Sequence, residues 1–284
     1  VTAVVLLPFL DVLAWMVSFL VRGTASQRAA DSEFDRLDQR FLLHPALAIE
    51  QSRITVNSMA RISKENALAA LAQLQHYDER EIKEIEQREE LVDRYEDRIG
   101  TYLVKLNTRE LDKQQNESVS KILHTLSDFE RISDHALNLA ESAQEIHSKG
   151  LHFSEDASRE MLVLSSAVSE ILELSFSAFT DEDESLAYKV EPLEEHIDIL
   201  CDEMKLRHVE RLQSGHSSLS QGFVFNDILT NCERVADHCS NIAIAMIELS
   251  ADNYSTHGYV LDLKEQRSHD FDRLYAQFAE KYKI

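Results

Sequence analysis

One stretch of this sequence occurs twice, and this repetition constrains the fold more than any other feature. Residues 128–141 read DFERISDHALNLAE, and residues 231–244 read NCERVADHCSNIAI, at an offset of 103 residues. Each copy carries a Glu and an Asp four residues apart, Glu130 with Asp134 and Glu233 with Asp237. Side chains at this spacing lie on one face of a helix. The chain is therefore predicted to contain a duplicated helical unit that presents paired carboxylates.

The rest of the chain favours long helices. It has only six Gly and three Pro in 284 residues, and its apolar residues recur at helical spacing. No segment alternates as a strand would, so the predicted fold class is all-α, with two tandem three-helix repeats and a tail helix. Pro192 is expected to kink the fifth helix. The expected helices cover about residues 47–77, 78–111, 114–148, 155–179, 182–213, 223–250 and 260–282.

The N-terminal residues differ from the rest. Residues 1–21 are almost entirely apolar, although Asp11 interrupts them, and Arg22 and Arg28 follow. This pattern predicts the end of a transmembrane helix with the remaining chain in the cytoplasm; the alternative is an amphipathic helix buried against the domain. The predicted organisation is a partial transmembrane helix (1–22), a polar linker (23–46), a first repeat (47–150), a second repeat (151–252) and a C-terminal tail helix (253–284).

Charge and cysteine content narrow the function classes. The formal net charge of −22 argues against nucleic acid as a partner, because binding a phosphate backbone needs a basic surface. The three cysteines, Cys201, Cys232 and Cys239, form no CxxC pair, which indicates reduced, buried thiols in the cytosol. No phosphate-binding glycine loop, HExxH or GxSxG motif occurs, so an enzyme is not expected.

The paired acids suggest a metal site. Carboxylates that converge from several helices are how metal sites in helical bundles are formed, and oxygen ligands favour Mg, Ca, Mn or Fe over structural Zn. The alternative is solvated acids paired with Arg131 and Arg234. His135 and His238, directly after the acids, either support such a site or pack between helices. Further acids lie on the neighbouring predicted helices: Asp93, Glu96, Asp97, Glu191, Glu194, Glu195 and Asp198.

The two repeated stretches closely resemble the signatures of PhoU domains. That family folds as two tandem three-helix repeats in a six-helix bundle, regulates phosphate uptake and signalling, and includes members that bind iron or zinc clusters through these acids. LDQRFLLHPALAIEQSR (37–53) resembles the segment that joins the last membrane helix to the PhoU-like domain in bacterial Na/Pi cotransporter family proteins. The resemblance implies a regulatory domain of a sodium-dependent phosphate transporter, on the cytoplasmic side of the inner membrane.

Carried over residue by residue, the resemblance implies metal ligands in both repeats. The expected ions are Fe, Zn, Mn or Mg. The second predicted helix has Gly100 where the pattern of the fifth has Asp198, so the two clusters are expected to differ in ligand number or in occupancy. The expected partners are the transmembrane part of the same protein, a second copy of the chain, and phosphate-signalling proteins. The predicted ligands are Glu130, Asp134, Glu233 and Asp237, with Glu96, Asp97, Glu194 and Asp198 from the preceding helices.

Overall fold

The structure is a computed structural model that describes residues 32–250 and 269–284, and within these residues it is helical without strands. The all-α prediction is confirmed. The predicted transmembrane segment lies outside the described residues. The elements are the 3₁₀ helix η1 (Gln39–Leu43) and the helices α3 (Pro45–Gln73), α4 (Glu79–Asn107), α5 (Lys113–Lys149), α6 (Glu155–Thr180), α7 (Glu184–Ala187), α8 (Val190–Gln213), α9 (Leu219–Ser250) and α11 (His269–Lys281).

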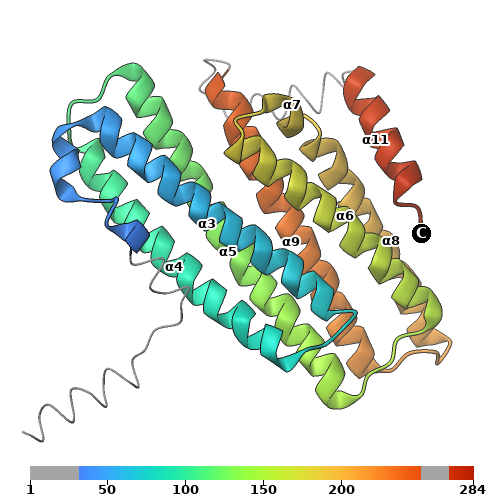
Figure 1. Cartoon of the computed structure of the whole chain (residues 1–284). Coiled ribbons are helices and arrows are strands. Elements are labelled where there is room, and N and C mark those ends of the chain that lie inside the picture. Colours follow the sequence, from blue (N-terminus) through green and yellow to red (C-terminus); the bar gives the residue numbers. More distant parts are fainter. Residues whose placement is uncertain (1–31, 251–268) are drawn as a thin grey trace, which may run out of the picture.

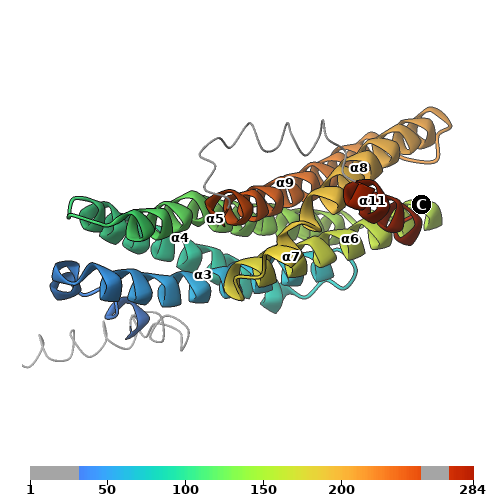
Figure 2. The same ribbon diagram turned by 90° about the horizontal axis from the view of Figure 1, so that it is seen from above.

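Six long helices form two three-helix units that lie side by side (Figure 1). Helices α3, α4 and α5 make the first unit, and α6, α8 and α9 make the second. The two units meet mainly where α5 packs along α9, the helices that carry the repeated stretches, and α3 adds a contact with α6. The view from above shows α5 beside α9 in the middle of the molecule, with α11 at the edge next to α8 (Figure 2).

Local signals in the sequence account for the helix ends. Asp112 caps α5 through a capping box with Gln115, and the Ser154 hydroxyl accepts a hydrogen bond from the Ala157 amide at the start of α6. Gly150 ends α5 in the left-handed conformation, with φ of 59°, which a residue without Cβ adopts at low cost. These ends agree with the predicted boundaries to within a few residues.

The core is continuous across both units. Phe129 of α5 is fully buried, and its ring lies 5.2 Å from Phe176 and 4.9 Å from Phe179 of α6, centroid to centroid. Its carbonyl oxygen accepts a hydrogen bond of 2.6 Å from the Ser63 hydroxyl of α3. One residue therefore connects α3, α5 and α6. Cysteines 201, 232 and 239 are free, buried thiols in this core, as predicted, and burial raises the pKa of each.

The predicted fifth helix is two helices, and the predicted kink at Pro192 is wrong. The chain breaks at residues 188–189, between the single turn of α7 and the long α8. Pro192 is the third residue of α8, in the first turn, where backbone N–H groups have no acceptor within the helix. Its missing N–H therefore removes no helical hydrogen bond.

The predicted linker includes a segment that packs on the bundle. The Phe34 ring contacts the Tyr95 ring edge-on at 4.8 Å, and the Tyr95 hydroxyl donates to the Glu33 carboxylate at 2.8 Å. Two turns further along α4, Tyr102 donates to the Asp38 carbonyl at 3.1 Å. Residues 32–44 thus lie against α4, because this part of the connector contains apolar side chains among its polar ones.

The tail helix packs on the second unit, a contact that the sequence did not predict. Phe278 and Tyr282 are buried, Lys281 pairs with Glu170 of α6 at 2.8 Å, and the Tyr275 ring packs against His196 of α8. Helix α11 therefore bridges α6 and α8 at the edge away from the first unit (Figure 1). The first residues of the predicted tail helix, 260–268, lie outside the described residues.

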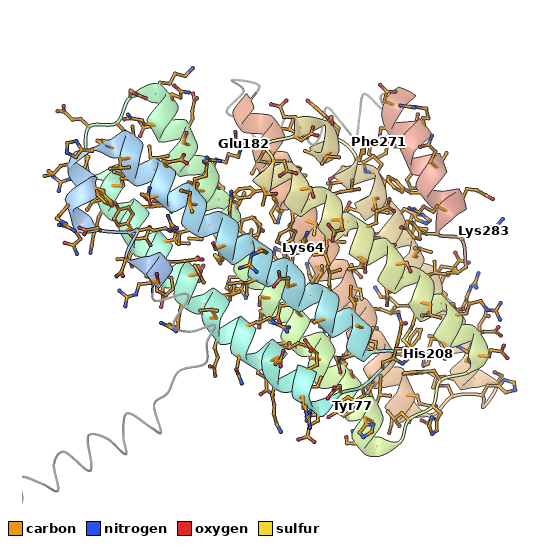
Figure 3. All side chains as sticks on the ribbon, in the orientation of Figure 1. Lys64, Tyr77, Glu182, His208, Phe271 and Lys283 are labelled. Carbon is orange, nitrogen blue, oxygen red and sulfur yellow. The ribbon has the colours of Figure 1, made fainter. Side chains whose placement is uncertain are left out.

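A buried histidine near the end of α8 gives a pH prediction. His208, labelled in Figure 3, stacks on Phe225 at 4.5 Å, and neither ring nitrogen has a hydrogen-bond partner among the described residues. Burial, and then the positive Arg211, lower its pKa. The unfolded chain therefore binds the proton more readily, so the stability due to neutral His208 is present above about pH 6.5 and is lost as pH falls below it.

We expect His208→Leu to become more stable relative to the wild type as the pH falls from 7 to 5. The difference should change by at most about 1.4 kcal/mol per pH unit, the limit for one proton. Urea unfolding at several pH values measures it. His124 is exposed on α5, and His124→Leu is the matched control that should show no pH-dependent difference. Parallel pH profiles for the wild type and His208→Leu would contradict the prediction.

Candidate metal centre in two acidic clusters

The first acidic cluster is defined by Glu89, Asp93, Glu96 and Asp97 of α4 with Glu130 and Asp134 of α5. Burial raises the pKa of Glu89 to about 7, and the negative charges of Asp93 and Asp134 raise it further. Burial also raises the pKa of Glu130, where Glu96 and Asp93 add to the effect. The carboxylates of the first acidic cluster are therefore partly shielded from water and repel one another.

The second acidic cluster consists of Glu194, Asp198 and Asp202 of α8 with Glu233 and Asp237 of α9. One carboxylate oxygen each from Glu194, Asp198 and Asp237 lies within 4.8 Å of the others. Asp198 Oδ1 is buried and has no hydrogen-bond partner among the described residues. Burial, followed by the charges of Asp237 and Glu233, raises the pKa of Asp198 to about 6.

The structure corrects the expected match between the two repeats. The buried positions of α4 coincide with those of α8 at an offset of 105 residues, so that Ile85 corresponds to Val190 and Ile99 to Met204. Glu89, Asp93 and Asp97 then correspond to Glu194, Asp198 and Asp202. Asp198 is therefore matched by Asp93, not by Gly100, and the expected match of Gly100 with Asp198 is wrong.

This register also revises which acids on α4 lie closest to the signature. Besides burial, the negative charge of Asp134 raises the pKa of Glu89 and of Asp93. In the same way, burial and the charge of Asp237 raise the pKa of Asp198. The charge of Glu96 contributes to the raised pKa of Glu130. The charge of Asp97 contributes to the raised pKa of its α4 neighbours Asp93 and Glu96. The predicted ligand set did not include Glu89 and Asp93, which the structure places in the first acidic cluster. The pattern of buried residues on α4 and α8, compared at different offsets, is the signal that could have found them.

The cations at the two clusters differ. Arg131 lies 3.5 Å from the Glu130 carboxylate, and its equivalent Arg234 lies 3.1 Å from Asp237; both side chains are more than half exposed. The second cluster has in addition Lys205 of α8, whose Nζ donates to Glu233 at 2.8 Å and lies 3.4 Å from Asp202. Gly100 occupies the corresponding position in the first cluster.

The signature histidines lie between the two repeats. His135 Nδ1 is 2.9 Å from Asn231 Oδ1, His238 Nδ1 is 2.9 Å from Asp128 Oδ1, and the two rings stack at 5.6 Å. Burial lowers the pKa of His135. Each histidine thus contacts the residue six positions before the signature Asp of the other repeat, so the packing of α5 on α9 accounts for the positions of both histidines.

The residues present fit a hard cation. Each cluster offers carboxylate oxygens from two helices, and the buried, unpartnered Asp198 Oδ1 would gain a ligand bond that it lacks in the protein alone. The nearby Cys201 thiol is buried and donates to the Leu229 carbonyl at 3.7 Å, so it points into the core. An oxygen-only donor set suits Mg, Mn or Fe better than a structural zinc.

A family model described as the PhoU domain matches residues 56–143 and 161–246 of this chain, one match in each three-helix unit. The chain belongs to the PhoU domain family. As a PhoU domain it places the two ExxxD signatures on α5 and α9, the helices that join its repeats.

Known proteins agree with this assignment. The PhoU domain is 27% identical over 134 residues to the Thermotoga maritima protein named phosphate-specific transport system accessory protein PhoU homolog 1, covering 47% of this chain and 57% of that one. The crystal structure of PhoU from Pseudomonas aeruginosa aligns with a TM-score of 0.68 at 21% identity, over 72% of this chain and 97% of that chain. The phosphate transport system regulatory protein PhoU from Streptococcus pneumoniae aligns with a TM-score of 0.64 at 18% identity, over 75% and 99%.

Among the described residues, one helix of this PhoU domain is long and apolar enough to cross a membrane. It is α6, and 56% of its most apolar window is buried inside the bundle. Since α6 carries core residues of the second unit, such as Phe176, packing in the domain accounts for its apolar character.

Proposed function

We propose that this chain is a cytoplasmic regulatory domain that binds metal ions at its two acidic clusters and modulates phosphate uptake by a sodium-dependent transporter at the inner membrane. The observation that carries the proposal is in the second cluster, where carboxylate oxygens of Glu194 and Asp198 of α8 and Asp237 of α9 lie within 4.8 Å of one another. Asp198 Oδ1 is buried there and has no hydrogen-bond partner among the described residues. The name of the Thermotoga maritima relative, phosphate-specific transport system accessory protein PhoU homolog 1, supports the link to phosphate.

The packed linker suggests how a change at the first cluster would reach a membrane part. Residues 32–44 contact Tyr95 and Tyr102 of α4, and Tyr95 directly precedes Glu96 of the first acidic cluster. A metal ion held there would supply positive charge that draws α4 and α5 together. The resulting shift of α4 would move Tyr95 and Tyr102, and with them the linker residues that they contact. The partner in this proposal is the transmembrane part of the same protein, and the ion is Fe, Zn, Mn or Mg.

Two other functions are tested by the same experiment. A structural bundle, in which the acids only solvate the surface, predicts that substitution of the signature acids changes nothing. A carboxylate-bridged metalloenzyme predicts metal-dependent turnover of a phosphoester or redox substrate. We favour regulation without catalysis because the clusters lie along helix faces, and the described residues place no nucleophile with an activating base beside them.

The test is the combined replacement of Glu130, Asp134, Glu233 and Asp237 by Ala in the whole protein. We expect stoichiometric metal in the wild type and loss of at least about nine-tenths of it in the variant, because each cluster loses two oxygen ligands. Mass spectrometry of the purified proteins measures metal content. Phosphate uptake by cells that express each protein, at low and high phosphate, measures regulation.

The matched control uses four exposed acids that belong to neither acidic cluster, one each on α5, α6, α8 and α9. This control, with Glu141, Asp156, Glu203 and Asp227 changed to Ala, should keep its metal and its uptake regulation. A variant with unchanged metal content, or unchanged uptake at both phosphate levels despite metal loss, would contradict the binding or the regulatory part respectively.

A further inference from the structure

A cleft lies between the packed linker and α4. Its volume is about 420 Å³, which falls in the range of small-molecule sites. Phe34 and Gln39 of the linker line one side of it, and Arg98, Thr101 and Lys105 of α4 line the other. The cleft therefore combines an aromatic ring, neutral polar groups and two cations.

The two cations of the cleft have no carboxylate partner. Arg98 and Lys105 lie two helical turns apart on one side of α4, and neither forms a salt bridge among the described residues. The Arg98 guanidinium lies 5.9 Å from the centre of the Phe34 ring, so the linker helps to hold it at the cleft. Asp97 also lines the cleft, which leaves one positive charge in excess.

The second repeat carries the opposite charges at these positions. In the register that matches the buried residues of α4 and α8, Arg98 corresponds to Glu203 and Lys105 to Glu210. Arg207 lies between these two glutamates on α8, and its guanidinium donates a hydrogen bond to Glu203. The protein thus supplies a counter-charge on this face of α8, whereas on α4 it leaves two cations that an anion from solution can reach.

The groups in the cleft suit a phosphate. Guanidinium and ammonium groups bind phosphate oxygens through charge-assisted hydrogen bonds, and the Thr101 hydroxyl and the Gln39 amide are further donors. The long side chains of Arg98 and Lys105 can both reach an anion placed midway, beside Thr101. The net charge of −22 repels anions from most of the surface, but acids farther away than about 8 Å are screened at physiological ionic strength, so the local cations decide.

We propose that this cleft binds inorganic phosphate or the phosphate group of a phosphate monoester, with Arg98 and Lys105 as the residues that contact it. The Phe34 ring offers an apolar surface to the organic part of an ester. Because the linker forms one wall of the cleft, a bound phosphate would hold the linker against α4. The proposal is carried by the cleft and its cations, and it does not depend on the proposed metal binding.

Isothermal titration calorimetry on the whole protein tests the site with two probes. One is inorganic phosphate, and the other is dihexanoylphosphatidic acid, a soluble lipid whose headgroup is a phosphate monoester. We expect at least one probe to bind, and the double variant Arg98→Gln with Lys105→Gln to bind it at least about tenfold more weakly, because two charge-assisted hydrogen bonds are lost. Both side chains are exposed, so the variant should keep its helices, which far-UV circular dichroism checks.

The matched control removes the same two charges elsewhere on α4. Arg80→Gln with Lys83→Gln changes exposed residues in the first turns of the helix, outside the cleft, and should bind the probes as the wild type does. Binding of inorganic phosphate would identify free phosphate as a ligand, and binding of the lipid alone would identify a lipid headgroup. No binding of either probe, or equal affinity in the wild type and the Arg98 and Lys105 variant, would overturn the proposal.

Two further comparisons exclude other causes of binding. Dihexanoylphosphatidylcholine has the same acyl chains without a phosphate monoester, and if it binds as well as the phosphatidic acid, the chains and not the phosphate are recognised. The variant with Glu130, Asp134, Glu233 and Asp237 changed to Ala should still bind the probe. Loss of binding in that variant would show that metal ions hold the phosphate and would overturn the site at Arg98 and Lys105, whereas a protein without metal that binds the probe would overturn only the proposed metal binding.

Discussion

Glu160→Ala is expected to destabilise the domain by about 3 kcal/mol, because it leaves two arginines without their buried counter-charge. Glu160 of α6 is 4% exposed, and its carboxylate accepts hydrogen bonds from Arg211 at 2.8 and 3.1 Å and from Arg207 at 3.3 Å. The Arg211 side chain is only 14% exposed, so water cannot replace the lost carboxylate. Equilibrium unfolding in urea measures the change.

Two further variants separate the causes. Glu160→Gln keeps the shape and the oxygen acceptor but removes the charge, and it should lie between the wild type and Glu160→Ala. Asp156→Ala removes an acid on the same helix whose pair with Arg159 is mostly exposed, and it should cost no more than about 0.5 kcal/mol. If Glu160→Ala proves as mild as Asp156→Ala, the two arginines find other partners and the buried ion pair does not stabilise the α6–α8 contact.

Phe129→Ala is expected to cost about 3–5 kcal/mol, the range for loss of a fully buried phenylalanine. The ring is fully buried between Phe176 and Phe179, so its removal leaves a cavity where α5 meets α6. The Ser63 hydrogen bond to the Phe129 carbonyl involves the backbone and remains possible in the variant. The loss should therefore report side-chain packing, and chemical denaturation monitored by far-UV circular dichroism measures it.

Phe223→Ala is the matched control for this prediction. Phe223 lies on α9 and is 70% exposed, so its removal should change the free energy of unfolding by no more than about 0.5 kcal/mol. A loss below about 1 kcal/mol in Phe129→Ala would show that the neighbouring phenylalanines fill the space. The contact between the repeats would then depend less on this ring than its position indicates.

Helices and their ends were predictable because their determinants are local. The Ser154 cap and Gly150 each act on the residues directly beside them, and helical periodicity shows in any window of a few turns. The predicted kink at Pro192 failed because the effect of a proline depends on where the helix begins, and the local sequence did not show that α8 begins only two residues earlier. The paired acids of each signature were also predictable, since a spacing of four residues places both on one face whatever the tertiary structure.

The correspondence between α4 and α8 was not predictable from their acids. Helix α4 carries carboxylates on several turns, and a shift by two turns matches acid with acid almost as well as the true register does. The buried residues decide the register, because Ile85 and Ile99 must face the core as Val190 and Met204 do. A register shift of two turns would leave the acids on the surface, but it would remove the isoleucines from the close-packed core.

By itself, the sequence determined the all-α class, the two repeats and the face on which Glu130, Asp134, Glu233 and Asp237 lie. Only the tertiary structure decided that Glu89 and Asp93 belong to the first cluster, that Lys205 enters the second, and that residues 32–44 pack on α4. The physical reason is range. Helix formation and side-chain spacing depend on neighbours within a few turns, whereas the register between helices is set by close packing of residues far apart in the chain.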